Sequence, residues 1–276
     1  MSDSDLPLIL ETDTLASLPV TDNVLLVAVC SKNVFLSGHI PGSQLIEPAE
    51  LVSGSKPAVG KLPSAERLSQ LFSRIGLTAD KHVIAYDDEG GGWAGRLIWT
   101  LDVLGHHRAS YLNGGLVAWR QSGQPLSGEP SEATPSTYEA VIDASQIATR
   151  QDVEAQIAEP QTLVWDARSR EEYVGSKLSS QRGGHIPGAF NLDWLELMDR
   201  DKALRLKPLA EIRQRLQSLG VGPDTALITH CQTHHRSGLS YLVGRALDLN
   251  IRAYDGSWSE WGNLADTPIE TGPGAE

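Results

Sequence analysis

Residues 38–42 read Gly-His-Ile-Pro-Gly, and residues 184–188 read Gly-His-Ile-Pro-Gly again. Two more landmarks recur in the same order: an apolar run at 82–86 and 226–230, and a stretch ending in tryptophan at 111–119 and 253–261. Each pair is separated by about 145 residues, and self-similarity at a fixed offset is typical of repeated structural units. The sequence therefore predicts a duplicated domain.

A stretch of different composition separates the two copies. Residues 121–136 are rich in Ser, Pro, Gly and Glu, which is typical of an extended linker. We expect a first domain at 1–124, a linker at 125–136 and a second domain at 137–276.

Each copy alternates short apolar runs with helical patterns. The expected strands are 24–29 and 83–86, then 162–165 and 226–229; the expected helices are 64–75 and 93–104, then 208–219 and 236–247. Gly76 and Gly220 follow two of these helices as stop signals. The alternation predicts an α/β fold in which each domain has a central, mainly parallel sheet flanked by helices. Ligands of such sheets bind beyond the carboxyl ends of the strands.

The composition limits the class of protein. The chain has 276 residues, of which 40% are hydrophobic, so a sizeable core is possible. Its net charge of −12 argues against a nucleic-acid or membrane-surface binder, which needs a basic face. The two cysteines, Cys30 and Cys231, are too few for a disulfide framework. With no signal peptide or membrane span evident, we expect a soluble cytoplasmic protein with reduced thiols.

The second cysteine lies in the most informative stretch, residues 229–238, which read Thr-His-Cys-Gln-Thr-His-His-Arg-Ser-Gly. It places Cys231 between an expected strand and an expected helix. Loop N–H groups and the positive end of a helix dipole both lower a thiol pKa, and the thiolate is the nucleophile. If the four residues between Cys231 and Arg236 curl around a centre, their N–H groups form an anion nest. We therefore predict a reactive sulfur rather than a buried structural cysteine.

The C-x4-R loop, the two Gly-His-Ile-Pro-Gly segments and the paired copies together resemble a two-domain rhodanese of the bacterial type, a thiosulfate sulfurtransferase. The resemblance covers essentially the whole chain and implies two tandem rhodanese-like domains. It also implies that Cys231 takes the outer sulfur of thiosulfate, releases sulfite and passes the sulfur from a persulfide to cyanide or a thiol. This is covalent catalysis without a further cofactor, with ping-pong kinetics.

The other expected site residues surround the thiol. Gln232 and Thr233 supply hydrogen bonds or line the rim, and His234 and His235 present N–H donors and partial positive charge or are exposed loop residues. Arg236 closes the anion nest or braces it from outside, and Ser237 caps the following helix. By resemblance, Arg182 approaches the active loop, where it could hold a substrate anion.

The first copy carries Asp87 where the second carries Cys231. A carboxylate cannot store sulfur and repels anions, so we expect the first domain to be non-catalytic. Cys30 ends an apolar strand without basic neighbours and is interpreted as a buried structural residue. Asp166 and Arg168 resemble the family's ion pair at a strand end, with an architectural role.

Several other functions fit parts of this pattern. A cysteine phosphatase or arsenate reductase has one more residue between Cys and Arg than this loop has. A persulfide carrier serving a sulfur-trafficking protein shares the loop chemistry, and mercaptopyruvate is an alternative sulfur donor. Zinc at Cys231 and the neighbouring histidines, or magnesium at the acidic pair 87–88, is less favoured because the ligand spacing is wrong or unsupported.

Overall fold

The computed structural model describes residues 6–19, 21–158 and 162–273. The chain forms two compact units. The first comprises Met1–Val52, Leu62–Asp143 and Met198–Leu206; the second comprises Ser53–Lys61, Ala144–Leu197 and Lys207–Glu276. Each unit thus includes a short segment from the other half of the sequence. Two domains are confirmed, while the boundaries at 124 and 137 remain a prediction.

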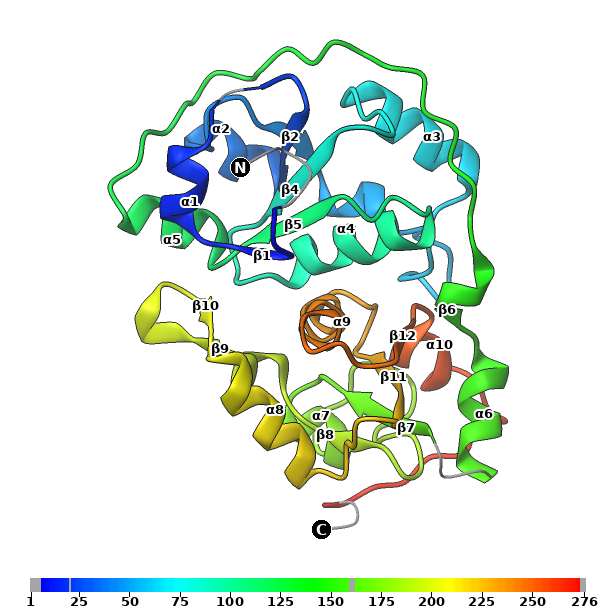
Figure 1. Ribbon diagram of the computed structural model, residues 1–276. Helices are drawn as coiled ribbons and strands as arrows, with labels where there is room; N and C mark the ends of the chain where they lie inside the picture. The colour runs from blue at the N-terminus through cyan, green and yellow to red at the C-terminus, as the bar shows by residue number, and fades with distance from the viewer. Residues whose placement is uncertain (1–5, 20, 159–161, 274–276) are drawn as a thin grey trace. The chain divides into compact units, whose positions relative to one another are not determined.

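The first unit is built on a parallel five-stranded sheet with the order β1-β5-β4-β2-β3. Its elements, most of which are labelled in Figure 1, are β1 (Ile9–Leu10), α1 (Thr12–Ser17), β2 (Val24–Val29), α2 (Lys32–Ser37), β3 (Gln44–Ile46), the 3₁₀ helix Pro48–Leu51, α3 (Ala65–Arg74), β4 (His82–Tyr86), α4 (Gly92–Val103), β5 (Ala109–Leu112) and α5 (Gly115–Gln121). The antiparallel strands β9 (Met198–Asp199) and β10 (Arg205–Leu206), which flank the 3₁₀ helix Arg200–Lys202, join this unit.

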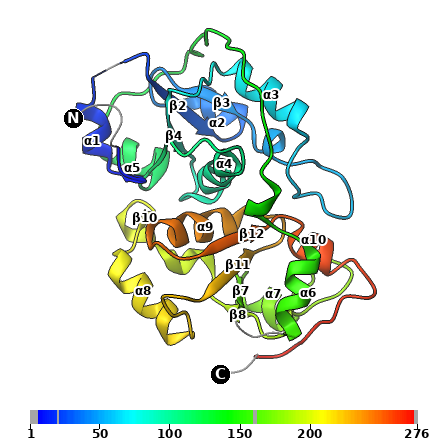
Figure 2. The ribbon, with the colours of Figure 1, turned by 45° about the vertical axis from the view of Figure 1, so that its right-hand side comes forward.

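The second unit repeats the parallel sheet with the order β6-β12-β11-β7-β8. Its elements, seen from a second side in Figure 2, are the 3₁₀ helix Ala144–Gln146, β6 (Ile147–Ala148), α6 (Arg150–Ala158), β7 (Thr162–Asp166), α7 (Arg170–Val174), β8 (Phe190–Asn191), the 3₁₀ helix Trp194–Leu197, α8 (Leu209–Ser218), β11 (Ala226–His230), α9 (Arg236–Ala246), β12 (Ile251–Tyr254) and α10 (Ser257–Trp261). The predicted α/β class with two similar domains is confirmed.

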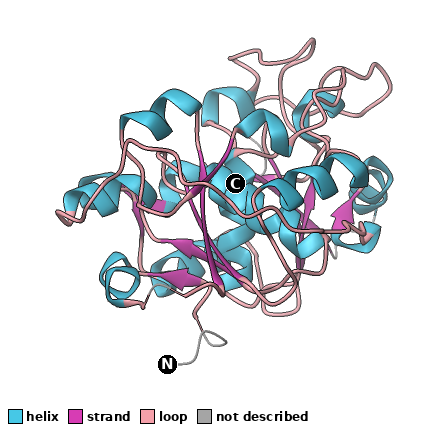
Figure 3. Cartoon of the chain, turned by 90° about the horizontal axis from the view of Figure 1, so that it is seen from above, coloured by secondary structure: helices cyan, strands magenta, loops and turns pink. Residues whose placement is uncertain are grey.

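The core residues explain why these runs form buried strands. Every side chain of β4 is buried, as are four of the five in β11, so both strands read as continuous apolar runs rather than alternating ones. Helices cover the sheets (Figure 3), and α4 and α9 pack on the central strands of their own units. Both glycines predicted to end helices have positive φ, +77° at Gly76 and +89° at Gly220, which favours glycine there.

The repeated Gly-His-Ile-Pro-Gly segments fold alike in both units. His39 is buried, stacks on the Phe35 ring at 3.6 Å, and its Nδ1 lies 2.8 Å from the Phe35 carbonyl oxygen. His185 does the same with Tyr173, at 3.7 Å between rings and 2.9 Å from Nδ1 to the carbonyl oxygen. Each histidine therefore braces its turn, which gives the segment a structural role.

The region after α5 is extended and lies along α3, as Figures 1 and 2 both show. The Ser136 N–H donates to the Ser73 carbonyl at 2.9 Å, and the Ala140 N–H donates to Ser69 Oγ at 2.9 Å. Among the described residues, no helix is long and apolar enough to cross a membrane.

Candidate active site

Cys231 directly follows β11, and α9 begins five residues later at Arg236. The residues between them form the active loop, Cys231–His235. The thiol is fully buried and stands beyond the carboxyl end of a central strand, where parallel sheets bind ligands. Strand–loop–helix geometry at this point is as predicted.

Helix α10 supports the first half of the active loop from outside. The Trp258 N–H donates to the Cys231 carbonyl at 3.0 Å, and the Ser259 N–H donates to the Gln232 carbonyl at 2.9 Å. Ser257 has φ +53° and its hydroxyl donates to the Tyr254 carbonyl at 2.9 Å. Two carbonyl groups are thereby held against α10, away from any anion that the loop would bind.

The environment of the thiol favours the thiolate. Burial alone would raise the pKa of Cys231, but the Arg236 charge, the Ser237 hydroxyl and backbone N–H, and the partial charge of His235 outweigh it and lower that pKa. The net direction is the one expected for a nucleophilic cysteine at a helix N-terminus.

Ser237 takes a different part from the one predicted. The residue preceding α9 is His235, whose side chain makes no capping bond, so the expectation that Ser237 caps the helix is wrong. Instead its buried hydroxyl lowers the pKa of the Cys231 thiol and lies 2.7 Å from Nδ1 of His234. His234 is itself fully buried with φ +54°, a backbone conformation that side-chain-bearing residues rarely adopt.

Arg236 forms a bidentate ion pair with Glu172. Its Nη1 lies 2.6 Å from Oε2, and its Nη2 lies 3.0 Å from Oε1. Burial would raise the pKa of Glu172, but hydrogen bonds from Arg236 and its charge lower it. This ion pair orients Arg236, and whether Arg236 closes the anion nest or braces it from outside stays a prediction.

Sequence reasoning missed Glu172. Ser169 and Glu172 form a capping box at the start of α7, and the Ser-x-x-Glu spacing gives a readable signal for that box. Nothing in the spacing indicates that the same carboxylate holds Arg236, 64 residues away.

The remaining loop side chains point to different neighbours. Gln232 exchanges hydrogen bonds with the loop at 179–180: Ser179 Oγ donates to its Oε1 at 2.7 Å, and its Nε2 donates to the Ser179 carbonyl at 2.9 Å. His235 is half-buried, with its ring centroid 5.7 Å from that of Trp194. Thr233, which lies between Gln232 and His234 in the sequence, is half-buried.

Arg182 lies against the segment that follows α10. Its guanidinium donates to the carbonyl oxygens of Trp261, Leu264 and Thr267 and to the Thr267 hydroxyl. These contacts tie the segment after α10 to the loop before His185. A substrate contact for Arg182 stays a prediction.

A buried charged cluster lies beneath the active loop. Asp166 and Arg168 are both inaccessible and pair at 2.5 Å, and His230 Nε2 lies 3.6 Å from Asp166 Oδ2. Register pairs His230 directly with Asp166 across β11 and β7. Arg168 also donates to the Gly184 carbonyl at 2.8 Å and lies 4.2 Å from the Trp258 ring centroid. These contacts link the strand ends to the second Gly-His-Ile-Pro-Gly segment and to α10, which fits the architectural role.

In the first unit the loop between β4 and α4 stands at the corresponding place and surrounds the carboxylate of Asp87. Asp87 Oδ1 accepts the N–H groups of Glu89, Gly90 and Gly91 at 3.2, 3.0 and 2.9 Å, and Oδ2 accepts that of Ala94 at 3.0 Å. Such convergence of backbone N–H groups is an anion nest. Burial and the neighbouring Glu89 charge raise the pKa of Asp87 to about 6, against the effect of these bonds.

Cys30 is buried like Cys231, but its pKa shifts in the opposite direction. It is buried in the apolar core of the first unit, and burial together with nearby acidic groups, chiefly Asp88, raises the pKa of its thiol to about 12. Its interpretation as a structural residue agrees with this environment.

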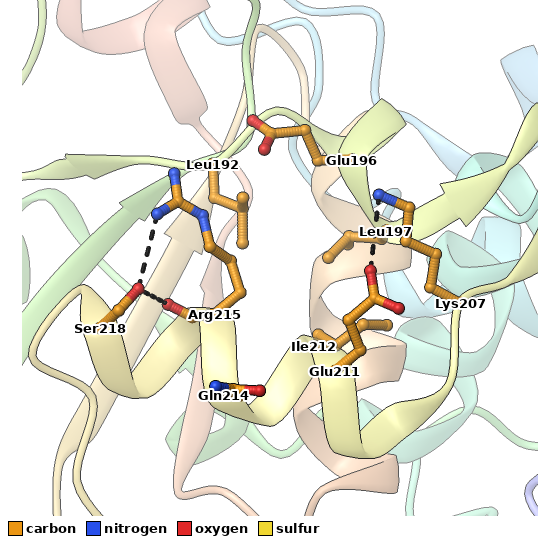
Figure 4. Close-up of a pocket in the computed structure, with 9 residues that line it drawn as sticks. All are labelled: Leu192, Glu196, Leu197, Lys207, Glu211, Ile212, Gln214, Arg215 and Ser218. Atoms are coloured by element: carbon orange, nitrogen blue, oxygen red, sulfur yellow. Dashed lines mark hydrogen bonds and ion pairs between the residues drawn. The ribbon is translucent and has the colours of Figure 1, made fainter.

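Other candidate ligand sites lie apart from the loop. Within the ranges that the structure describes, no three His, Cys, Asp or Glu side chains gather where they could hold a metal ion. A cavity of about 350 Å³ lies beside α8 (Figure 4), where Lys207 faces Glu211 at 3.9 Å. None of its lining residues belongs to the active loop.

Comparisons with known proteins agree with this geometry. The chain matches the rhodanese-like domain family at residues 11–122 and again at 149–264. The chain therefore belongs to the rhodanese family, with two such domains. It is 44% identical over 97% of its length to a thiosulfate sulfurtransferase of Pseudomonas aeruginosa, of which it covers 98%, and 42% identical over the same share to one of Azotobacter vinelandii.

A more distant relative is named for a different function, and a solved structure shares the fold. The chain is 33% identical to the sulfur carrier protein TtuD of Thermus thermophilus, with 86% of each chain covered. Among solved structures, a complex of EanB with ergothioneine superposes with a TM-score of 0.86 at 20% identity, over 96% of this chain and 70% of that one, which shows the shared fold.

Proposed function

We propose that this protein is a thiosulfate sulfurtransferase that carries sulfane sulfur on Cys231. The observation that carries the proposal is a buried cysteine in the loop between β11 and the start of α9, with the Cys231 and Gln232 carbonyls bonded to α10 and with Arg236 and Ser237 lowering the pKa of the thiol. The two relatives that are 42% and 44% identical over nearly the full length are thiosulfate sulfurtransferases, which supports thiosulfate as the donor.

The chemistry has two half-reactions. The Cys231 thiolate attacks the outer sulfur of thiosulfate, the S–S bond of thiosulfate breaks, and sulfite leaves with the bonding electron pair. Cyanide, or a thiolate acceptor, then attacks the outer sulfur of the persulfide and regenerates the Cys231 thiolate. The positive end of α9 and the donors of Ser237 stabilise negative charge on sulfur at both stages.

Positively polarised groups at the site also explain how a protein with a negative net charge would bind thiosulfate, a dianion. With a net charge of −12, the overall field repels thiosulfate, so attraction must come from groups at the site. Arg236 and the α9 terminus are such groups, and Glu172 orients Arg236 while cancelling part of its charge.

We further propose that only the second domain carries sulfur. The nest of the first domain accepts the Asp87 carboxylate where a persulfide would otherwise lie. A chain with one sulfur site should bind one sulfur atom per molecule.

Steady-state kinetics test the function. Varying thiosulfate at several cyanide concentrations should give the parallel double-reciprocal lines of a ping-pong mechanism, with a higher kcat/KM for thiosulfate than for mercaptopyruvate. Intersecting lines, or preference for mercaptopyruvate, would reject thiosulfate transfer through a persulfide as the main reaction.

A second candidate is a persulfide carrier that passes sulfur to a protein partner. The name of the 33% identical relative, a sulfur carrier protein, favours this possibility. Faster sulfur loss from Cys231 to a captured partner protein than to cyanide would support it.

A further inference from the structure

The segment Ser53–Lys61 belongs to the same compact unit as the active loop, although it lies in the first quarter of the sequence. It is closed by its own backbone: the Ser53 N–H donates to the Lys61 carbonyl at 2.7 Å, and the Gly54 N–H donates to the Val59 carbonyl at 3.0 Å. These two hydrogen bonds join the ends of the segment and close it into a loop.

Gly60 of this segment lies directly against the main chain of Thr233. A Cβ atom on Gly60 would stand 2.3 Å from the Thr233 carbonyl oxygen and 2.6 Å from its carbonyl carbon, both far inside contact distance. Gly60 does not have a positive φ, so space rather than backbone conformation requires glycine here.

The contact fixes the peptide between Thr233 and His234. In a trans peptide the C=O and N–H groups point in opposite directions, so the Thr233 carbonyl that lies against Gly60 leaves the His234 N–H on the side away from the segment. His234 has φ +54°, and such a conformation persists only where neighbouring groups hold it. Gly60 is one of the neighbouring residues that restrict His234 to this conformation.

Lys61 anchors the segment to the helix that supports the loop. Its Nζ lies 2.6 Å from Glu260 Oε1, and Glu260 also accepts the Tyr254 hydroxyl at 2.8 Å. Glu260 lies on α10, whose Trp258 N–H holds the Cys231 carbonyl. The Ser53–Lys61 segment, α10 and the active loop thus each contact the other two.

We propose that Ser53–Lys61 positions the active loop, with Gly60 and Lys61 as positioning residues for sulfur transfer at Cys231. The proposal rests on the sulfurtransferase function proposed above. It predicts that a change at either residue displaces the Thr233–His234 peptide and thereby alters the reactivity of a thiol that neither residue touches.

Two variants with matched controls test the proposal. Gly60→Ala adds the clashing Cβ, whereas Gly222→Ala adds one that meets only a side-chain oxygen at 3.4 Å. Lys61→Gln removes the anchor, Lys61→Arg restores it, and Lys56→Gln alters an exposed lysine of the same segment. The readouts are kcat/KM for thiosulfate and the pH dependence of Cys231 alkylation by iodoacetamide.

We expect Gly60→Ala to lower kcat/KM by about tenfold or more and Lys61→Gln by about threefold, since small misplacements of reacting groups are costly. Gly60→Ala and Lys61→Gln should also shift the pH dependence of Cys231 alkylation to higher pH, whereas Lys61→Arg should keep that of the parent protein. The controls Gly222→Ala and Lys56→Gln should have a kcat/KM within about twofold of the parent value. Gly60→Ala and Lys61→Gln behaving like their controls would overturn the proposal.

If Gly60→Ala fails to fold by circular dichroism, the three lysine variants decide alone. Failure of the proposed function has a different signature, because the unchanged protein would then form no persulfide with thiosulfate. The alkylation profiles do not depend on sulfur transfer and still decide whether the segment positions Cys231.

Discussion

Arg236 is held by Glu172 in a bidentate ion pair, with N–O distances of 2.6 and 3.0 Å, so the cation of the active loop is oriented by a carboxylate from α7. The pair is largely buried, with side-chain exposures of 20% for Arg236 and 5% for Glu172. Charge-assisted bidentate bonds of this kind fix geometry as well as charge.

Glu172→Gln should therefore weaken both stability and activity. Removing one partner of a buried pair leaves the other uncompensated, and we expect a loss of about 2–3 kcal/mol in the free energy of unfolding, measured by urea denaturation. Thiosulfate kcat/KM should fall about tenfold as Arg236 loses its orientation. Glu171→Gln, at an exposed neighbouring position, is the control; equal effects of both variants would contradict a specific role for the pair.

Ser237→Ala should raise the pKa of the Cys231 thiol, because the Ser237 hydroxyl lowers that pKa. The thiolate is the reactive form, so the rate of persulfide formation should fall more at pH 6 than at pH 9. Ser240 is a buried serine on the same helix, and the control Ser240→Ala should leave the pH dependence of persulfide formation unchanged. A uniform loss of rate at all pH values in Ser237→Ala would argue against a role in thiolate stabilisation.

Asp87 should make the protein less stable as the pH rises through about 6. Its pKa is raised from 3.8 to about 6 in the folded state, so folding favours the protonated form. The stabilisation is present below pH 3.8 and is lost towards pH 6, a change of about 2–3 kcal/mol for this shift. Comparing urea denaturation at pH 4.5 and pH 7 measures it.

Asp87→Asn should abolish the part of the pH dependence of the unfolding free energy that comes from Asp87. It should also cost about 1–3 kcal/mol at pH 7, because an amide NH₂ would face backbone N–H donors. Asp22→Asn, at an exposed position of the first unit, serves as the control. An unchanged pH dependence in Asp87→Asn would show that another group is responsible.

Arg168→Leu should be strongly destabilising, by about 3–5 kcal/mol, since it leaves Asp166 buried without its partner. Replacing both residues by leucine should cost less than the single change, because no unpaired charge remains. Urea denaturation of the two variants measures this difference. A double variant that is less stable than the single one would contradict an architectural role based on charge compensation.

The local sequence predicted the features that depend on neighbouring residues. The strand before Cys231, the helix after it and the repeated His-Ile-Pro turn follow from apolar runs, glycine stops and a repeat. Contacts between distant segments leave no such signal. Glu172 joins Arg236 and Gly60 meets Thr233 only in the folded chain, and Ser237 serves the thiol instead of the helix end.

The most direct test of sulfur storage on Cys231 is mass spectrometry of the intact protein after incubation with thiosulfate and removal of excess reagent. We predict the mass of one added sulfur atom, located on the peptide containing Cys231, with equimolar release of sulfite. Cys30→Ala should give the same result, and Cys231→Ser should gain no sulfur and turn over no thiosulfate. Sulfur on Cys30, two sulfur atoms per chain, or turnover by Cys231→Ser would contradict a single persulfide site at Cys231.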